Sequence, residues 1–208
     1  MRILTLGGVD FRAELRKIGH DVWSIVGAGG KSHPQEIEFD YFLNPSATPG
    51  IIRKLALLLK PDALFLGDDS GPNIHLGLEA IGIPKAWYSI DTHLHGWHRH
   101  YAPIFDHVFV AQKNQLDGMR TYTRNIEWLP LCTFSDVEFV PWEDRVHEVS
   151  FVGKLDRHLN PWRVDLIEGV KARGIDIHVA TGDYVSVFSR SKVVINQAVW
   201  YDLNFRFF

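Results

Sequence analysis

Three aspartates follow apolar runs of the sequence at points where a buried strand would end. Asp68 and Asp69 come after the run 63–66, and Asp91 comes after the run 85–90. In an open parallel sheet, ligands bind at the edge formed by the carboxyl ends of the strands. These acids are therefore candidates for a general base at one crevice, although each would also suit a turn or a helix cap.

A pair of glycines belongs to the same expected edge. Gly7 and Gly8 come directly after the apolar run 2–6, and Asp10 follows close behind. Because 2–6 is expected to be a strand of the same sheet, this loop is expected to face the crevice that the aspartates face.

The stretch 91–100 carries four of the 11 histidines of the chain. A metal site needs two or three imidazoles and a carboxylate that converge on one point, and His93 and His95 beside Asp91 have a suitable spacing. The motif H-E-x-x-H is absent, however, and Arg99 stands between two of the histidines. We favour a histidine that acts beside Asp91 as an acid, base or hydrogen-bonding group, with no bound metal.

A glycine and a lysine follow a later apolar run. The run 149–152 leads into Gly153 and Lys154, and Arg157 and Arg163 come soon after. A turn of this kind can bring backbone N–H groups and a cation to a diphosphate. Because strands very often end in glycine, the motif is a weak signal by itself.

Two nucleotide-binding fingerprints are incomplete. Gly30-Lys31-Ser32 matches the end of the phosphate-binding pattern G-x-x-x-x-G-K-[ST], but its first glycine would fall on Ile25. No glycine cluster completes G-x-G-x-x-G, so the dinucleotide-binding fingerprint is absent as well.

Short apolar runs alternate with amphipathic stretches in the first two thirds of the chain. This alternation predicts an α/β fold with a parallel sheet and helices on both faces. The expected strands are 2–6, 21–26, 63–66, 85–90, 107–111 and 126–129. The expected helices are 11–18, 49–60, 73–81 and 113–122.

The alternation lapses at 133–147, which we interpret as a linker, and then restarts. Strands are expected at 149–152, 175–180 and 193–195, and a helix at 161–173. The expected domains are therefore 1–132 and 148–208. A second doubly wound domain usually needs roughly 100 residues, so we expect the second domain to be partial and the chain to be a fragment.

The composition is that of an ordinary globular protein. Of 208 residues, 46% are hydrophobic and 23% are charged, which excludes a disordered or fibrous chain. A net charge of −3 and a pI near 6.4 predict no general attraction to nucleic acid, and we expect no nucleic acid among the partners. Cys132, the single cysteine, excludes an internal disulfide. No apolar run approaches the roughly 18 residues of a membrane span, so we expect no integral membrane segment and a cytoplasmic location.

Several short motifs of the chain resemble one family. They are Phe11-Arg12-Ala13-Glu14-Leu15-Arg16-Lys17-Ile18-Gly19-His20-Asp21-Val22, residues 105–112, residues 150–153, residues 191–196, and Leu203-Asn204-Phe205-Arg206-Phe207-Phe208. The layout resembles the GT-B glycosyltransferases, in which two Rossmann-like domains face each other across a cleft. More narrowly, it resembles the CgeB-like, or spore maturation protein, group.

The resemblance implies transfer of a sugar, hexosyltransferase-like, from a nucleotide-sugar co-substrate to an acceptor that the sequence does not specify. GT-B enzymes usually need no metal, and no other cofactor is implied. In that family the last run continues as Asn-x-Arg-x-Phe-Glu-Ala, and the Glu contacts the ribose of the donor. On this basis Gly153, Lys154, Asn204 and Arg206 are assigned to the donor side, and the chain, which ends where that Glu would come, is expected to be inactive alone.

On the acceptor side, Asp91 and His93 are the candidates for the base or its orienting group, with Asp69 behind them. The loop of Gly7 and Gly8 is assigned to the same side. Two alternatives from other classes stay open. One is a metal-dependent hydrolase centred on Asp91, His93 and His95, and the other is a non-catalytic domain that binds a sugar or a nucleotide.

Overall fold

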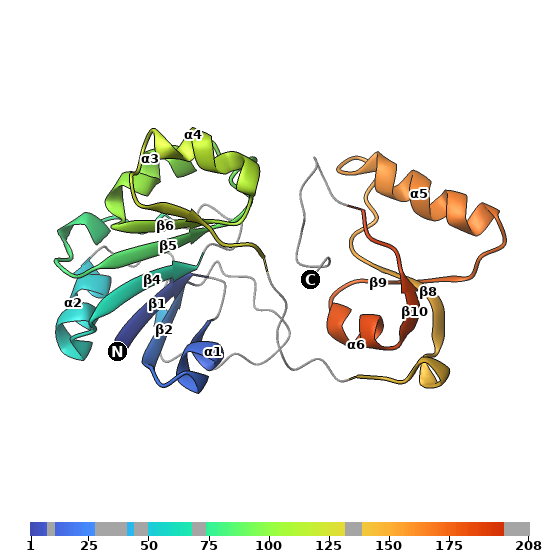
Figure 1. The fold of residues 1–208 in the computed structure, drawn as a ribbon, viewed down its shortest axis with the longest axis horizontal. Helices are drawn as coiled ribbons and strands as arrows, with labels where there is room; N and C mark the ends of the chain where they lie inside the picture. Colours follow the sequence, from blue (N-terminus) through green and yellow to red (C-terminus); the bar gives the residue numbers. More distant parts are fainter. Residues whose placement is uncertain (8–10, 28–40, 44–49, 68–73, 132–138, 198–208) are drawn as a thin grey trace. The chain divides into compact units, whose positions relative to one another are not determined.

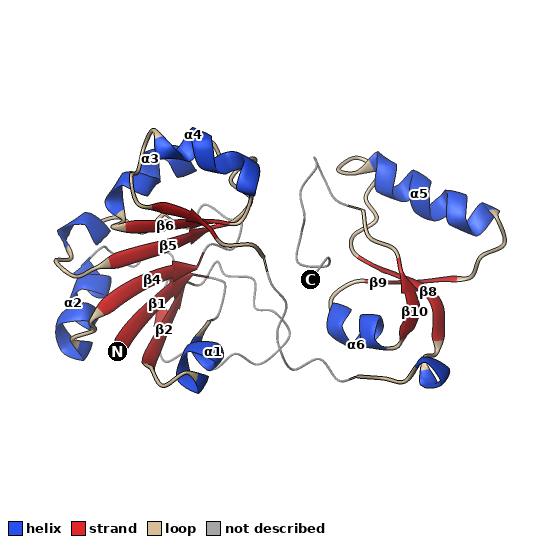
Figure 2. Ribbon diagram, viewed as in Figure 1, coloured by secondary structure: helices blue, strands red, loops and turns tan. Residues whose placement is uncertain are grey.

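The computed structural model describes residues 1–7, 11–27, 41–43, 50–67, 74–131 and 139–197 (Figure 1). The chain divides into two compact units, Met1–Pro130 and Leu131–Phe208. Each unit is built on a parallel β-sheet of its own, with helices packed against it (Figure 2). The α/β class and the parallel sheets that the alternation predicts are therefore confirmed.

The first unit contains a seven-stranded sheet in the order β3-β2-β1-β4-β5-β6-β7, with every neighbouring pair parallel. The strand order reverses between β1 and β4, which is the position where open α/β sheets bind ligands at the carboxyl ends of the strands. The strands are β1 (Arg2–Gly7), β2 (Asp21–Gly27), β3 (Tyr41–Leu43), β4 (Ala63–Gly67), β5 (Lys85–Ser89), β6 (His107–Val110) and β7 (Ile126–Trp128).

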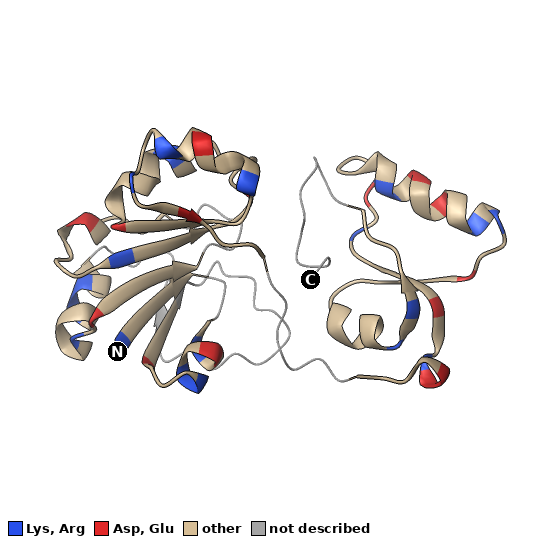
Figure 3. Ribbon diagram, in the orientation of Figure 1, with Lys and Arg blue, Asp and Glu red and all other residues tan. Residues whose placement is uncertain are grey.

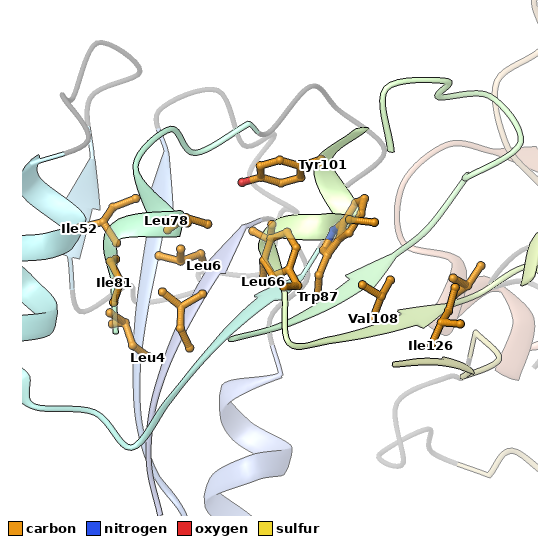
Figure 4. Close-up of a cluster of buried hydrophobic side chains, with 14 of the residues drawn as sticks. Leu4, Leu6, Ile52, Leu66, Leu78, Ile81, Trp87, Tyr101, Val108 and Ile126 are labelled. Carbon is orange, nitrogen blue, oxygen red and sulfur yellow. The ribbon is translucent and has the colours of Figure 1, made fainter. Parts of the chain in front are cut away.

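One face of this sheet carries the main hydrophobic core (Figure 4). Leu66 and Trp87 are paired in register on β4 and β5, and both are almost completely buried. Ile52 of α2 (Gly50–Leu59) and Tyr101 of α3 (His98–Tyr101) cover them, together with Met119 of α4 (Leu116–Arg120). Burying an aliphatic or aromatic side chain of this size contributes roughly 1.5–3 kcal/mol, so this layer supplies much of the stability of the unit.

The opposite face is covered by α1 (Arg12–Lys17) and the residue before it. The ring of Phe11 meets the rings of Phe65 and Tyr88 edge-on, with centroids 5.2 and 5.7 Å apart. These two residues alternate with the core residues along β4 and β5, as a strand buried on both faces requires.

The second unit contains a three-stranded parallel sheet in the order β10-β8-β9. Its core is Phe151, Ile167 and Ile177, and α5 carries charges of both signs along its length (Figure 3). The elements are β8 (His147–Val152), α5 (Pro161–Ala172), β9 (Ile177–Ala180), α6 (Tyr184–Ser189) and β10 (Ser191–Val194).

The structure differs from the predicted elements in several places. The expected helix 73–81 is only a short 3₁₀ turn, Leu78–Ala80, because Gly77 before it has a left-handed φ of 89° that interrupts helical geometry. The strand β3 has three residues, which is too short for a periodic signal. The helix α6 was not expected either, although Asp183 caps it by accepting a hydrogen bond from the Ser186 backbone N–H at 3.0 Å.

Among the described residues, the structure contains no helix with the length and apolar character needed to cross a membrane.

Substitution of Gly7 by alanine tests the close approach of β1 and β4. Gly7 has a φ of 99°, and a Cβ atom there would lie 1.9 Å from the carbonyl oxygen of Gly67 on the paired strand. We expect Gly7→Ala to lower the free energy of unfolding by at least about 2 kcal/mol, measured by urea denaturation.

Gly82→Ala is the matched control. Gly82 is exposed, and among the described residues no atom lies within 4 Å of the Cβ that it would gain. Its effect should stay within about 0.5 kcal/mol. Equal losses for the two variants would contradict the steric explanation for Gly7.

Candidate functional site

Asp91 lies in the turn that follows the carboxyl end of β5. Its side chain is partly exposed, and its φ of 51° is in the left-handed region that residues other than glycine rarely adopt. The backbone of the turn is closed by a hydrogen bond from the Leu94 N–H to the Asp91 carbonyl oxygen at 2.8 Å. Residues held in such a conformation occur often at functional sites, because the surrounding structure must fix them.

His93 is in the same turn, two residues after Asp91. Its imidazole is half-buried, and among the described residues its buried Nδ1 atom has no hydrogen-bond partner. A buried polar atom without a partner is costly and calls for an explanation, such as a bound ligand. The structure thus places two of the predicted acceptor-side residues in one turn at the edge of the sheet.

A buried polar cluster lies beneath this turn. We call it the Ser89 cluster, and it consists of Ser89, Thr92, His98 and Gln112. The Ser89 Oγ atom is 2.8 Å from His98 Nδ1 and 2.8 Å from Thr92 Oγ1. The backbone N–H of Thr92 donates to Gln112 Oε1 at 3.2 Å. Ser89 and His98 are completely buried, and the other two residues are less than a tenth exposed.

His98 is surrounded by aromatic rings. Its ring centroid lies 4.9 Å from that of Trp87 and 4.2 Å from that of Trp97, and both contacts are edge-on. Burial lowers the pKa of His98 from its ordinary value of 6.5 to about 3, and a smaller contribution comes from the neighbouring charge of His95. The imidazole is therefore neutral at physiological pH and acts as a hydrogen-bonding group.

Of the remaining residues predicted on the acceptor side, the structure describes only Gly7. Gly7 ends β1 and is paired with Gly67 at the end of β4, so its lack of a side chain is explained by the contact between the two strands. Gly8 and Asp69 lie outside the described residues.

On the donor side, Gly153 and Lys154 follow β8 as predicted. A Cβ atom at Gly153 would lie 2.9 Å from the ring of Phe151 and 3.7 Å from an Nη atom of Arg163. The carbonyl oxygen of Lys154 accepts a hydrogen bond from the same guanidinium at 3.2 Å, and the Lys154 side chain is exposed. Asn204 and Arg206 lie outside the described residues.

Arg163 lies in the first turn of α5, and its hydrogen bond to the Lys154 carbonyl oxygen connects this helix to the loop that follows β8. It is only 8% exposed, and its guanidinium lies over the ring of Phe151 at 5.6 Å. Burial lowers the pKa of Arg163, and among the described residues its buried Nε atom has no hydrogen-bond partner. A buried cation at a helix N-terminus is suited to an anion such as a phosphate. The sequence pattern contained Arg163 but gave no sign that it would be buried.

Arg157 behaves differently from Arg163 although both follow the same glycine. Its guanidinium bonds to Asp165 and to Glu168, each at 2.7 Å, and half of its side chain is exposed. Arg157 therefore braces α5.

Within the parts of the chain that are described, no three His, Cys, Asp or Glu side chains converge closely enough to hold a metal ion. The arrangement of Asp91, His93 and His95 thus gives no support to the metal-dependent hydrolase.

The neutral state of His98 predicts how stability depends on pH. The unfolded chain binds a proton at His98 below pH 6.5 and the folded chain does not until about pH 3, so this residue contributes a loss of stability as pH falls through that range. The loss is up to about 1.4 kcal/mol per pH unit. Between pH 7 and pH 5 we expect the free energy of unfolding of the wild-type protein, measured by urea denaturation, to fall by about 2 kcal/mol because of His98. This decrease should be absent in His98→Phe.

His100→Phe, which changes an exposed histidine of the same helix, is the control and should keep the pH dependence of the wild-type protein. If His98→Phe also keeps it, the imidazole of His98 is not neutral in the folded chain.

Comparison with known proteins gives the fold. No protein-family profile and no curated protein sequence matches the chain. Among solved structures, an α-glucosyltransferase in complex with UDP and a 13-mer DNA with a central A:G mismatch matches with a TM-score of 0.59 and 12% identity, over 93% of this chain and 71% of that one. An α-glucosyltransferase in complex with UDP-glucose and DNA containing an abasic site matches with a TM-score of 0.53 and 11% identity, over 93% and 72%.

These neighbours correct one expectation. The expectation that nucleic acid is not a partner is wrong as an inference from low net charge, because both neighbours are in complex with DNA as well as with UDP or UDP-glucose. Net charge averages over the whole surface, whereas binding of a polyanion depends on the charge of one face. With its two parallel sheets and these neighbours, the chain has the GT-B fold of glycosyltransferases.

Proposed function

We propose that this protein is a glycosyltransferase that uses a nucleoside-diphosphate sugar as its donor. The observation that carries the proposal is the fold, which it shares with two α-glucosyltransferases that hold UDP or UDP-glucose. The alternative of a non-catalytic sugar- or nucleotide-binding domain is less well supported, because the turn after β5 provides a carboxylate and an imidazole suited to proton transfer.

The donor diphosphate is proposed to bind at the carboxyl end of β8. Arg163 supplies a buried positive charge there, and Lys154 supplies an exposed one. Gly153 is assigned to the same side, and its missing Cβ leaves room for the Phe151 ring over which Arg163 lies. The developing negative charge on the leaving diphosphate would be stabilised by these cations and by the first-turn N–H groups of α5, which requires no bound metal. By the family resemblance, Asn204 and Arg206 complete this side.

The acceptor is proposed to be activated in the turn after β5. As the acceptor oxygen bonds to the anomeric carbon, the bond between that carbon and the diphosphate oxygen breaks, and the acceptor proton passes to the Asp91 carboxylate. His93, whose Nδ1 has no partner among the described residues, would orient the acceptor or Asp91, with Asp69 behind them. The narrower assignment to the CgeB-like group remains part of this proposal.

The class of acceptor can be identified by testing which candidate acceptors the protein binds. Since both structural neighbours hold DNA, DNA belongs among the acceptors to be tested, beside small saccharides and proteins.

The donor side is tested by Arg163→Gln. Loss of a charge-assisted hydrogen bond to a phosphate costs about 1.5–3 kcal/mol, so UDP should bind roughly 10- to 100-fold more weakly in a calorimetric titration. Arg173→Gln, which changes an exposed arginine at the other end of α5, should leave UDP affinity unchanged. Unchanged affinity in Arg163→Gln, with a normal melting curve, would remove Arg163 from the donor site.

The acceptor side is tested by Asp91→Asn. Loss of a general base should reduce turnover of a UDP-sugar by about 10²- to 10⁴-fold while UDP affinity stays the same. Asp117→Asn, an exposed aspartate on α4 of the same unit, serves as the control. Near-normal turnover in Asp91→Asn would mean that this carboxylate only shapes the turn.

A further inference from the structure

The Ser89 cluster lies in a region where the core alone would favour apolar side chains. Ser89 ends its strand between the buried residues Tyr88 and Ile90, and the rings of Trp87 and Trp97 contact His98. Buried polar groups are costly unless every one is hydrogen-bonded, and replacing such a set by apolar groups of similar shape is often neutral or stabilising. The cluster therefore calls for a role besides packing.

The hydrogen bonds of the cluster hold the chain on both sides of Asp91. Ser89, two residues before it, bonds to Thr92, one residue after it, through their hydroxyl groups. The carbonyl oxygen of Ser89 accepts from the Ala111 N–H at 3.0 Å, and the backbone N–H of Thr92 donates to the Gln112 side chain. Two adjacent residues after β6 thus hold both ends of the Asp91 peptide segment.

His98 is the link between this segment and the helix α3. Its Nδ1 atom is bonded to the Ser89 hydroxyl, and its backbone N–H donates to the His95 carbonyl oxygen at 3.0 Å. The hydrogen bond between Ser89 and His98 therefore joins the chain just before Asp91 to the end of the turn at His98. Because Asp91 has a positive φ, its backbone needs such external support to remain in place.

We propose that the Ser89 cluster fixes the position of the Asp91 carboxylate for proton transfer, with Ser89 and His98 as its positioning residues. This inference rests on the proposed function, in which Asp91 takes the proton of the acceptor. Ser89 and His98 act through the backbone of the turn, and neither touches the substrate. A misplacement of about 1 Å in such a group can cost on the order of 100-fold in rate.

The first measurement is hydrolysis of a panel of UDP-sugars, in which water replaces the acceptor, by the full-length protein. For Ser89→Ala and His98→Phe we expect kcat to fall roughly 10- to 100-fold, with KM and the affinity for UDP within about twofold of wild type. His98→Asn, whose amide can bond to Ser89 in place of Nδ1, should recover most of the lost kcat. His100→Phe is the matched control on α3 and should leave kcat unchanged.

The second measurement separates positioning from general destabilisation. In an Asp91→Asn background, His98→Phe and Ser89→Ala should cause no further loss of kcat, because the group that they position is already absent. A further loss of the same size in that background would overturn the proposal, and so would a normal kcat in both single variants. If His98→Phe does not fold, Ser89→Ala, which removes one oxygen atom, decides by the same criteria.

The proposed function can fail separately. A full-length wild-type protein that binds UDP and hydrolyses no UDP-sugar would refute the proposed function, and with it the inference. An active wild-type chain with unaffected cluster variants would refute the inference alone.

Discussion

The pairing of β1 with β4 is the constraint on which the first unit depends. At this pair the strand order reverses, so β2 and β3 extend the sheet to one side, and β5, β6 and β7 extend it to the other. The pair closes on Gly7 and Gly67, where a single added carbon would collide with a backbone oxygen. All the strands are parallel, and their carboxyl ends therefore lie along one edge, where the turn with Asp91 is found.

Much of this arrangement could be predicted from the sequence, because burial on both faces of a parallel sheet leaves long apolar runs between turns. The strands around Leu4, Leu64 and Trp87 were predictable for that reason. Elements that depend on tertiary contacts were not. Gly77 stops a helix that the apolar spacing suggested, and the three residues of β3 pair with β2 without any periodic signal of their own.

The site was predictable to a different degree. Asp91 and His93 could be proposed because residues that directly follow a strand of a parallel sheet lie at the edge formed by the carboxyl ends of the strands. The Ser89 cluster could not, because its four members come from three places in the chain and meet only when β5 and β6 pair and α3 folds back. The only signal was a serine between the apolar residues Tyr88 and Ile90. For Arg163, the sequence contained the charge, and only the packing against Phe151 showed that it is buried.

The brace made by Arg157 has a consequence for the anion site that we propose at the end of β8. The helix α5 carries two carboxylates near its first turns, and both are bound by this one arginine. Because Arg157 pairs with Asp165 and Glu168, these carboxylates already have a counter-charge. The guanidinium of Arg163 therefore does not have to pair with the acids of its own helix. An anion that binds there competes with fewer internal counter-charges, and because the Arg163 guanidinium is buried, salt screens this pair less than it screens an exposed one.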